Sequence, residues 1–389
     1  MLKRVGGVAA VLVALVVVGA AGAGCSSSSS SSPPATSPAQ QLTTGLKQLV
    51  AMPGGPVGAI AVVQTKAGAR VSTAGVADRA TGQPVTDGDF MRLASVAKAY
   101  NGAVALSLVQ QGKLALSGTI GQLLPGQFPA WSAITVAQLL QHTSGLPDYT
   151  KSPGFVAQLT ADPTATITPP QIVGFVANQP PLFAPGSRYH YSDTDNIVVG
   201  LIVEAVTGQS YESELAATVY TPLSLTDTSL PSTTAMGQPT LRGYAVPKGQ
   251  PPEDITTALS PSGAWASGGM VSTPSELNTF MRAYVAGRLF GPTVQHQQLQ
   301  FVPGSSGPPG PGVNSAGLAI YRYQTKCGTV FGHTGNFPGY TMFAAATPDG
   351  SRSVVVAVNT QLNDKKPVSA AYTALRNVES TAVCAALAG

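Results

Sequence analysis

The chain has 389 residues, of which 43% are hydrophobic and only 10% are charged. This length exceeds what one ordinary core fills, so we expect either one large domain with two lobes or two domains. The charged fraction lies far below the roughly 25% of average proteins, and the net charge is only +4. Apart from Lys3 and Arg4 near the start, no run of Lys and Arg stands out, which argues against a nucleic-acid partner.

Residues 1–24 are predicted to be a signal peptide. Lys3 and Arg4 precede an uncharged apolar run over residues 5–18, and small residues follow up to Cys25. This end of the run resembles a bacterial lipobox, in which the cysteine is lipidated, although Gly22 stands where an aliphatic residue is usual. We therefore expect export and a lipid anchor on the outer face of the bacterial cell membrane. A cleaved signal without a lipid, or an uncleaved anchor helix, remains an alternative.

Residues 25–40 read as a tether between this anchor and a folded domain over residues 41–389. Seven consecutive serines and a proline-rich stretch contain nothing that a core could bury. The chain has three cysteines. If Cys25 is lipidated, Cys327 and Cys384 remain, and we expect them to form a disulfide in an exported protein. Two buried free thiols are the alternative.

The first predicted elements of the domain are a helix over residues 42–52 and strands over 57–64 and 70–76. An apolar extended run over 90–94 leads into a helix that starts at Ser95. The middle is mainly helical, with helices over residues 135–142, 169–178, 195–206, 211–220 and 275–288. Strands over 317–323, 329–332, 340–347 and 353–359 precede a final helix over 368–386. The order predicts an α/β protein of the α+β type, whose antiparallel sheet combines N- and C-terminal strands, flanked by helices, with an inserted helical lobe.

The first candidate catalytic pair is Ser95 and Lys98. A serine at a helix N-terminus lies where free N–H groups and the helix dipole favour negative charge, and Lys98 returns to the same face one turn later. A hydroxyl beside an ammonium is a nucleophile that still needs a base. Alone, the S-x-x-K pattern is more typical of a helix cap than of catalysis.

Two further patterns supply the missing groups. Tyr191-Ser192-Asp193 lies just before a helix with a predicted N-cap at Asp195, and a nearby cation would let the tyrosine act as a base. His333, Thr334 and Gly335 follow a predicted strand. Free backbone N–H groups there would bind an oxyanion or pair with a peptide-like substrate.

In this order the three motifs resemble the penicillin-recognising serine enzymes, with class C β-lactamases and serine D-Ala-D-Ala carboxypeptidases as the closest match. The resemblance covers residues 42–384. It includes the sequence LLQHTSGL over residues 139–146, the Pro-Gly pair before the tyrosine, and ASGGMVST over 266–273. Within it, we expect His142 to be a structural histidine.

The resemblance implies a β-lactamase/transpeptidase-like fold and an acyl-enzyme on Ser95. Either Lys98 or Tyr191 would accept the serine proton, and the sequence does not decide between them. The backbone N–H groups of Ser95 and Asn336 would hold the oxyanion. The substrate-binding set is completed by His333, Thr334, Gly335, Asp193 and Trp265, where His333 and Thr334 would contact a substrate carboxylate and Trp265 is either core or cleft wall. No cofactor or metal is implied, and we expect a monomer.

Two departures from the family pattern concern the substrate. His333 stands where most β-lactamases have lysine, which is more like the peptidases and esterases; a partly charged histidine would make anion binding pH-sensitive. Asp193 stands where asparagine is usual. An ionised carboxylate cannot donate a hydrogen bond to a substrate amide carbonyl, and it could instead pair with Lys98.

The sequence therefore predicts a cell-envelope serine hydrolase that acts on a small peptide, ester or β-lactam. D-Ala-D-Ala carboxypeptidase-like or esterase-like activity is favoured, since no acidic residue is recognisable as a dedicated deacylating base. A β-lactamase, or a non-catalytic lipid-anchored binding protein on the same fold, is the alternative.

Overall fold

A computed structural model of the chain describes residues 37–389. The predicted signal peptide, the predicted lipidation site Cys25 and most of the predicted linker lie outside the described residues. Within residues 37–389, no helix has the length and apolar character needed to cross a membrane.

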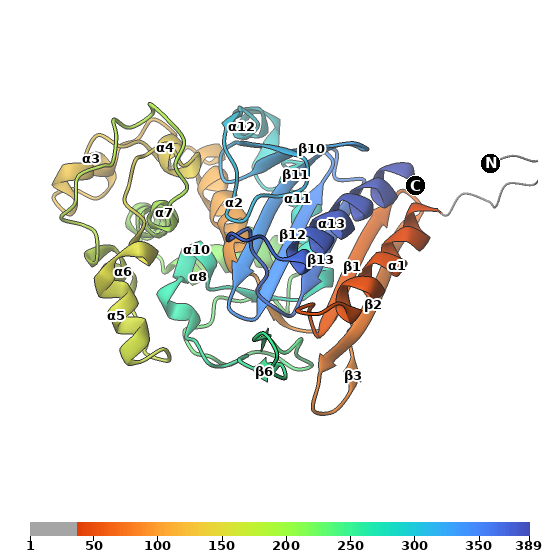
Figure 1. Cartoon of the computed structure of the whole chain (residues 1–389). Coiled ribbons are helices and arrows are strands. Elements are labelled where there is room, and N and C mark those ends of the chain that lie inside the picture. The colour runs from red at the N-terminus through yellow and green to blue at the C-terminus, as the bar shows by residue number, and fades with distance from the viewer. Residues whose placement is uncertain (1–36) are drawn as a thin grey trace, which may run out of the picture. The chain divides into compact units, whose positions relative to one another are not determined.

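A nine-stranded antiparallel sheet forms the centre of the domain, with the order β3-β2-β1-β13-β12-β11-β10-β9-β8 (Figure 1). Strand β1 (Gly58–Thr65) pairs with β13 (Ser353–Val358), so the two ends of the chain meet in the middle of the sheet. The predicted antiparallel sheet built from both ends is confirmed. The remaining strands are β2 (Gly68–Asp78), β3 (Gln83–Pro84), β8 (Val302–Pro303), β9 (Val313–Ala316), β10 (Tyr321–Thr325), β11 (Gly328–Phe337) and β12 (Tyr340–Ala346).

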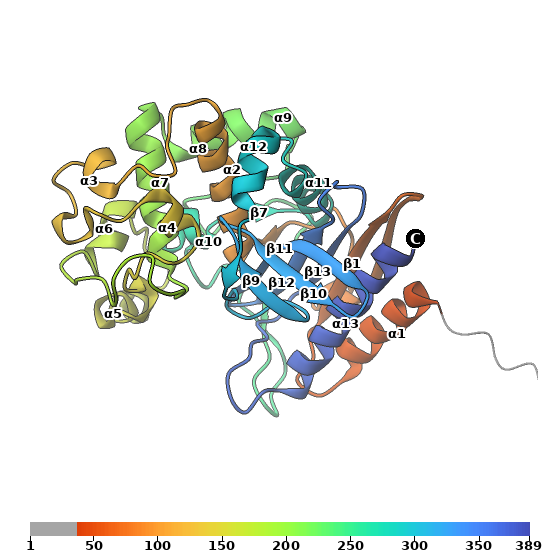
Figure 2. The same cartoon turned by 90° about the horizontal axis from the view of Figure 1, so that it is seen from above.

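Both faces of the sheet are covered. In β1, Ala59, Ala61 and Val63 belong to the core beneath α1 (Pro38–Ala51) and α13 (Ala370–Ala388), whereas Ile60 and Val62 belong to the core on the opposite face. Successive side chains of a strand point to opposite faces, so a strand that is buried on both reads as a continuous apolar run. Figure 2 shows α1 and α13 side by side on one face, with α2 (Ala97–Gln110) and α11 (Pro274–Val285) on the other.

Helix α1 begins at Pro38, four residues earlier than predicted, and thus includes the end of the predicted linker. Ser37 is its N-cap and forms a capping box with Gln40. These two side chains satisfy backbone N–H groups that a helix start otherwise leaves free, and a proline at the first position is compatible with them. The helix can therefore start before its first buried residue, Leu42.

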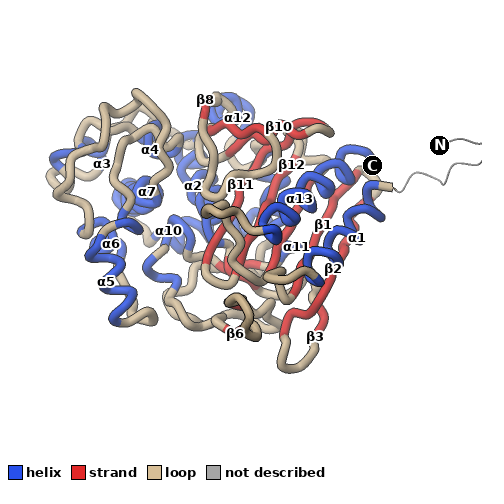
Figure 3. The backbone as a smooth tube through the Cα atoms, in the orientation of Figure 1, coloured by secondary structure: helices blue, strands red, loops and turns tan. Residues whose placement is uncertain are grey.

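The segment between α2 and α11 forms the inserted lobe of short helices and long loops (Figure 3). Its helices are α3 (Ile120–Leu123), α4 (Val136–Leu140), α5 (Pro153–Ala161), α6 (Pro169–Gly174), α7 (Asp193–Thr207), α8 (Tyr211–Leu215), α9 (Thr221–Leu223) and α10 (Trp265–Gly268). Two small strand pairs lie outside the main sheet, namely β4 (Met91–Arg92), which precedes α2, with β7 (Val271–Ser272), and β5 (Tyr244–Ala245) with β6 (Glu253–Asp254). Helix α12 (Gly291–Gln298), which follows α11, was not predicted, because it buries only Val294 and Gln298 and so has no apolar periodicity.

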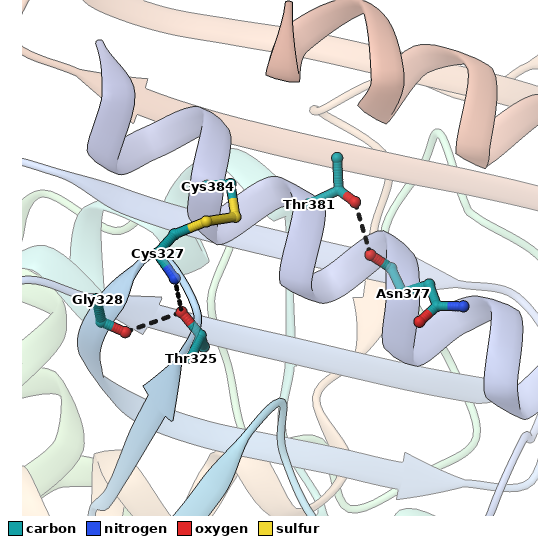
Figure 4. Close-up of a disulfide and its surroundings, with 6 residues drawn as sticks. All are labelled: Thr325, Cys327, Gly328, Asn377, Thr381 and Cys384. Atoms are coloured by element: carbon teal, nitrogen blue, oxygen red, sulfur yellow. Dashed lines mark hydrogen bonds between the residues drawn. A yellow bond between two sulfur atoms is a disulfide. The ribbon is translucent and has the colours of Figure 1, made fainter.

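Cys327 and Cys384 form a disulfide, with their Cα atoms 5.2 Å apart (Figure 4). Cys327 lies in the turn between β10 and β11, and Cys384 lies in the last turns of α13. The bond therefore ties the C-terminal helix to the hairpin whose second strand carries the H-T-G motif.

Candidate active site

Ser95 lies in a 3₁₀ turn over Ala94–Val96 that leads directly into α2. The helix itself begins at Ala97, so Ser95 precedes it by two residues instead of starting it as predicted. Ala94 has a φ of +49°, a left-handed conformation that costs a residue with a side chain about 1–2 kcal/mol. A strained residue immediately before the candidate nucleophile is typical of a functional turn.

Strand β11 packs closely against this turn, and Gly335 makes the approach possible. A Cβ atom at position 335 would lie 2.6 Å from the carbonyl oxygen of Leu93 and 3.2 Å from the Cβ of Ala94. A side chain there would push the strand away from the serine. Strand β11, which carries the H-T-G motif, can therefore pack against the turn of Ser95 only because position 335 is a glycine.

Lys98 is fully buried and uses all three of its N–H donors. Its Nζ lies 3.0 Å from Ser95 Oγ, 2.5 Å from Asp193 Oδ1 and 2.6 Å from the carbonyl oxygen of Ser267. The first two partners were predicted as site residues. Ser267 was not, although the segment that contains it was part of the family resemblance.

Asp193 is the first residue of α7, whose N-cap is Ser192 and not Asp195 as predicted. A carboxylate in the first turn is favoured by the positive end of the helix dipole. Burial raises the pKa of the Asp193 carboxyl, and the charge of Lys98 opposes that shift. The anticipated pairing of Asp193 with Lys98 is present in the structure.

Tyr191 is the third member of the predicted catalytic set. The Lys98 Nζ lies 5.1 Å from the centre of its ring, and its buried hydroxyl has no hydrogen-bond partner within residues 37–389. Burial raises the pKa of Tyr191 well above its usual value, the negative charge of Asp193 raises it further, and the neighbouring Ser95 hydroxyl acts in the opposite direction. This environment favours the neutral phenol over the phenolate.

His142 packs against the ring of Tyr191. The centres of the two rings lie 4.5 Å apart. His142 Nδ1 is 2.7 Å from Asp195 Oδ2, and Asp195 Oδ1 accepts a hydrogen bond of 2.5 Å from the Ser144 hydroxyl. Burial first, and then the charge of Lys98, lowers the pKa of His142 to about 3, so the imidazole is neutral. This arrangement agrees with a structural role for His142, and it explains why Asp195 is buried instead of capping the helix.

The H-T-G motif lies inside β11 and not after a strand end as predicted. Strand β11 pairs with β12 as far as Phe337, but its pairing with β10 ends at Gly332. One edge of the segment from His333 to Phe337 therefore has no strand partner in the described part of the chain. An extended substrate could pair with such an edge.

The structure corrects the predicted charge of His333. Burial first, and then the charge of Lys98, lowers the pKa of His333 to about 3, so its charge does not vary near neutral pH. Its Nδ1 lies 2.6 Å from the Thr334 carbonyl oxygen. The Thr334 hydroxyl lies 2.6 Å from Ser306 Oγ and 2.7 Å from the Pro308 carbonyl oxygen. The expected pH sensitivity of His333 is therefore wrong. Neither side chain is among the residues that line the cavity described next, and their contact with a substrate carboxylate stays a prediction.

A cavity of 270 Å³ opens beside Ser95. Ser95, Asp193 and Asn336 all line it, so the two residues expected to supply the oxyanion donors border one space. The Asn336 side chain is occupied elsewhere, since it donates to Thr341 Oγ1 at 3.0 Å and to the Leu362 carbonyl at 2.5 Å. Most of the wall is apolar, and no Lys, Arg or His lines it among the described residues. The apolar wall consists chiefly of Tyr149, Phe155, Leu159, Leu259 and Phe337.

Trp265 does not belong to this wall, so of the two predicted alternatives, core or cleft wall, the structure favours the core. Its ring packs against α7, where a Cβ at Gly200 would lie 2.6 Å from it, and against Tyr211 at 5.0 Å between ring centres. The wall residues Phe155 and Phe337 were not predicted. Phe337 could have been predicted to line the cavity, because it directly follows the predicted oxyanion residue Asn336.

Comparison with known proteins gives one consistent picture. A family model described as Beta-lactamase matches residues 45–378. Penicillin-binding protein 4 of Amycolatopsis lactamdurans is 32% identical over 156 residues, which are 39% of each chain. Esterase EstB of Burkholderia gladioli is 34% identical over 185 residues, 44% of this chain and 46% of the esterase. These alignments thus span less than half of the curated relatives.

Solved structures match over more of the chain. A D-stereospecific amidohydrolase from Streptomyces sp. is 30% identical with a TM-score of 0.75, and the match covers 87% of this chain and 97% of that one. The D-amino acid amidase of Ochrobactrum anthropi SV3, in complex with D-phenylalanine, has a TM-score of 0.78 at 24% identity, covering 90% and 98%. The second match supports the fold alone.

Proposed function

Because the chain belongs to the beta-lactamase family of serine hydrolases, we propose that Ser95 attacks the carbonyl carbon of a small amide or ester and forms an acyl-enzyme. One observation carries this proposal. A buried ammonium lies 3.0 Å from the Ser95 hydroxyl at the edge of a cavity that is large enough for a small acyl group.

Each group near Ser95 has a role in the proposed reaction. The bond from Ser95 Oγ to the carbonyl carbon forms while the hydroxyl proton moves to Lys98, whose ammonium must first release one of its three protons so that Nζ can accept this one. The backbone N–H groups of Ser95 and Asn336 bind the oxyanion; loss of one such donor costs about 10²- to 10³-fold in rate. Tyr191, as a neutral phenol, is placed to pass a proton to the leaving nitrogen or oxygen. Water then attacks the ester and releases the acid.

Amidase or esterase activity fits the cavity best. No Lys, Arg or His among the described residues lines it, so a substrate carboxylate would find no cation there. The names of the esterase and amidohydrolase relatives point in the same direction. D-Ala-D-Ala carboxypeptidase activity is the second candidate, because the unpaired edge of β11 could bind a peptide backbone. β-Lactamase activity ranks behind both, since Asp193 cannot donate to a side-chain amide carbonyl.

Labelling of the serine tests this proposal. We expect wild-type protein to react with a fluorophosphonate probe, Ser95→Ala to remain unlabelled, and the exposed-serine control Ser187→Ala to label like the wild type. An amino-acid amide, an acyl ester, a D-Ala-D-Ala peptide and a cephalosporin, assayed side by side, would rank the activities. Folded wild type that fails to label, or a Ser95→Ala variant that keeps the cellular phenotype, would instead support a binding protein on this fold.

We also propose that the enzyme is exported and anchored through a lipid on Cys25, and that it acts as a monomer. The apolar run and the small residues before Cys25 support the anchor. Wild-type protein should incorporate labelled fatty acid and sediment with membranes, whereas Cys25→Ala should do neither. Size-exclusion chromatography of detergent-free protein that starts at Ser37 would test the monomer.

A further inference from the structure

The two oxygens of Asp193 have different environments. Oδ1 accepts the hydrogen bond from Lys98, whereas Oδ2 accepts none from any residue in the described chain. The side chain is 21% exposed and lines the cavity. One carboxylate oxygen of the candidate active site is therefore available to a ligand.

This oxygen belongs to a carboxylate that lies next to the reacting carbonyl. Lys98 Nζ bonds to Ser95 Oγ at 3.0 Å and to Asp193 Oδ1 at 2.5 Å. Because both hydrogen bonds start from Nζ, the distance between Ser95 Oγ and Asp193 Oδ1 cannot exceed the sum of their two lengths. A group that binds Asp193 must be within a few bonds of the carbon that Ser95 attacks.

The surroundings favour a positively charged group there. Lys98 has no free N–H, and no other cation faces the cavity among the described residues. A carboxylate accepts hydrogen bonds but donates none, and in an apolar cavity a charged donor is its strongest partner. Phe155, Leu159 and Phe337 line the same space and offer contact to an apolar side chain.

We propose that Asp193 selects acyl donors with a free α-ammonium group, so that the substrates are amides or esters of apolar α-amino acids. This inference rests on the proposed acyl-enzyme chemistry at Ser95. The ammonium binds Asp193 Oδ2, the apolar side chain contacts the Phe155 wall, and the carbonyl carbon faces Ser95. Ser95 Oγ bonds to that carbon, the bond to the amide nitrogen or ester oxygen breaks, and the leaving group takes the proton. Water then releases the amino acid.

The test compares three substrates that differ only at the α-carbon substituent. Phenylalanine p-nitroanilide, its N-acetyl derivative and the desamino 3-phenylpropionyl anilide are assayed at pH 6.5, with both enantiomers of the first two. We expect wild-type kcat/KM to be roughly 10- to 100-fold higher for the free amine than for either neutral analogue, because hydrogen bonds to charged groups have that effect. The N-acetyl derivative loses the charge and gains bulk, whereas the desamino compound only loses the amine, so comparing the two separates these effects on kcat/KM.

Asp193→Asn provides the matched variant, because it keeps the size of the side chain and removes its charge. We expect it to reduce the ratio of kcat/KM values between amine and desamino substrates to within about 3-fold. Asp162→Asn removes the same charge from an exposed turn and should leave the ratio as in wild type. Fluorophosphonate labelling separates the two proposals. If Ser95 is labelled but wild type shows no preference for the amine substrate, or Asp193→Asn keeps the wild-type ratio, only this inference is overturned. If Ser95 is not labelled at all, the proposed acyl-enzyme chemistry is overturned as well.

Discussion

Lys98 and Asp193 form an ion pair of 2.5 Å that joins α2 to the first turn of α7. The lysine is fully buried, and it bonds the candidate nucleophile with a second N–H group. The same contact therefore connects the helix that follows Ser95 with the inserted lobe. Its loss would affect both stability and chemistry.

Lys98→Met should abolish acylation and destabilise the fold. Removing one partner of a buried ion pair leaves the other charge without compensation, which typically costs about 3 kcal/mol or more. We expect the free energy of unfolding in urea to fall by about that amount, and fluorophosphonate labelling to slow by at least about 100-fold. The double variant Lys98→Met/Asp193→Asn should recover most of the stability and none of the labelling. If Lys98→Met is labelled at the wild-type rate, Lys98 has no role in acylation.

Gly335→Ala should disturb the site through the backbone. The added Cβ would lie 2.6 Å from the Leu93 carbonyl oxygen, so β11 must move away from the turn that carries Ser95. Overpacking of this kind costs about 1–3 kcal/mol, and a small misplacement of reacting groups can slow a reaction by about 100-fold. Labelling kinetics and thermal unfolding measure the two effects. Gly174→Ala is the matched control, because nothing lies within 4 Å of a Cβ there; equal behaviour of the two variants would refute the argument.

His333 should make the fold less stable in weak acid. Its pKa falls from the usual 6.5 to about 3 on folding, so the unfolded chain binds more protons between these values. Stability is fully present above pH 6.5 and decreases as the pH falls toward 3. At pH 5 the loss amounts to about 2 kcal/mol.

The variant His333→Asn isolates this effect, since an amide can replace the Nδ1 hydrogen bond and does not titrate. The difference in unfolding free energy between wild type and variant should shift by about 2 kcal/mol in favour of the variant between pH 7.5 and pH 5. Because other groups titrate in both proteins, their contributions cancel. A difference that is independent of pH would show that His333 is not buried in its neutral form.

The disulfide between Cys327 and Cys384 should be detectable in the isolated protein. Native, unreduced protein should show no alkylatable thiol at Cys327 or Cys384, whereas reduced protein should show both. Cys384→Ser should lower the free energy of unfolding by about 2–4 kcal/mol, because the bond closes a long loop. Since the bond lies far along β11 from the H-T-G motif, we expect labelling of Ser95 in the folded variant to stay near the wild-type rate.

The sequence was sufficient for features that depend on local patterns. Apolar runs at both chain ends predicted the antiparallel sheet, and the order of three short motifs predicted which segments meet around Ser95. Element boundaries were less accurate where a cap decided them, as Ser37 does for α1 and Ser192 for α7.

Features that depend on the surroundings of a residue could not be predicted. His333 reads as a titrating histidine, but burial beside Lys98 keeps it neutral. The sequence could not decide whether Trp265 is core or cleft wall, because its position depends on space left by Gly200, 65 positions earlier in the chain. The free oxygen of Asp193 follows from the direction in which Lys98 approaches it.

The pairing of β1 with β13 has a consequence for how the protein is made. The sheet cannot close until the strand near the C-terminus is available, since Gly58 N–H bonds to the side chain of Asn359, 301 positions later. Contacts of such long sequence separation slow folding. A newly synthesised chain therefore stays without its central strand pair until residues 353–358 have been made. That delay suits a polypeptide that must be threaded through a translocon before it folds, which is the route we expect from residues 1–24.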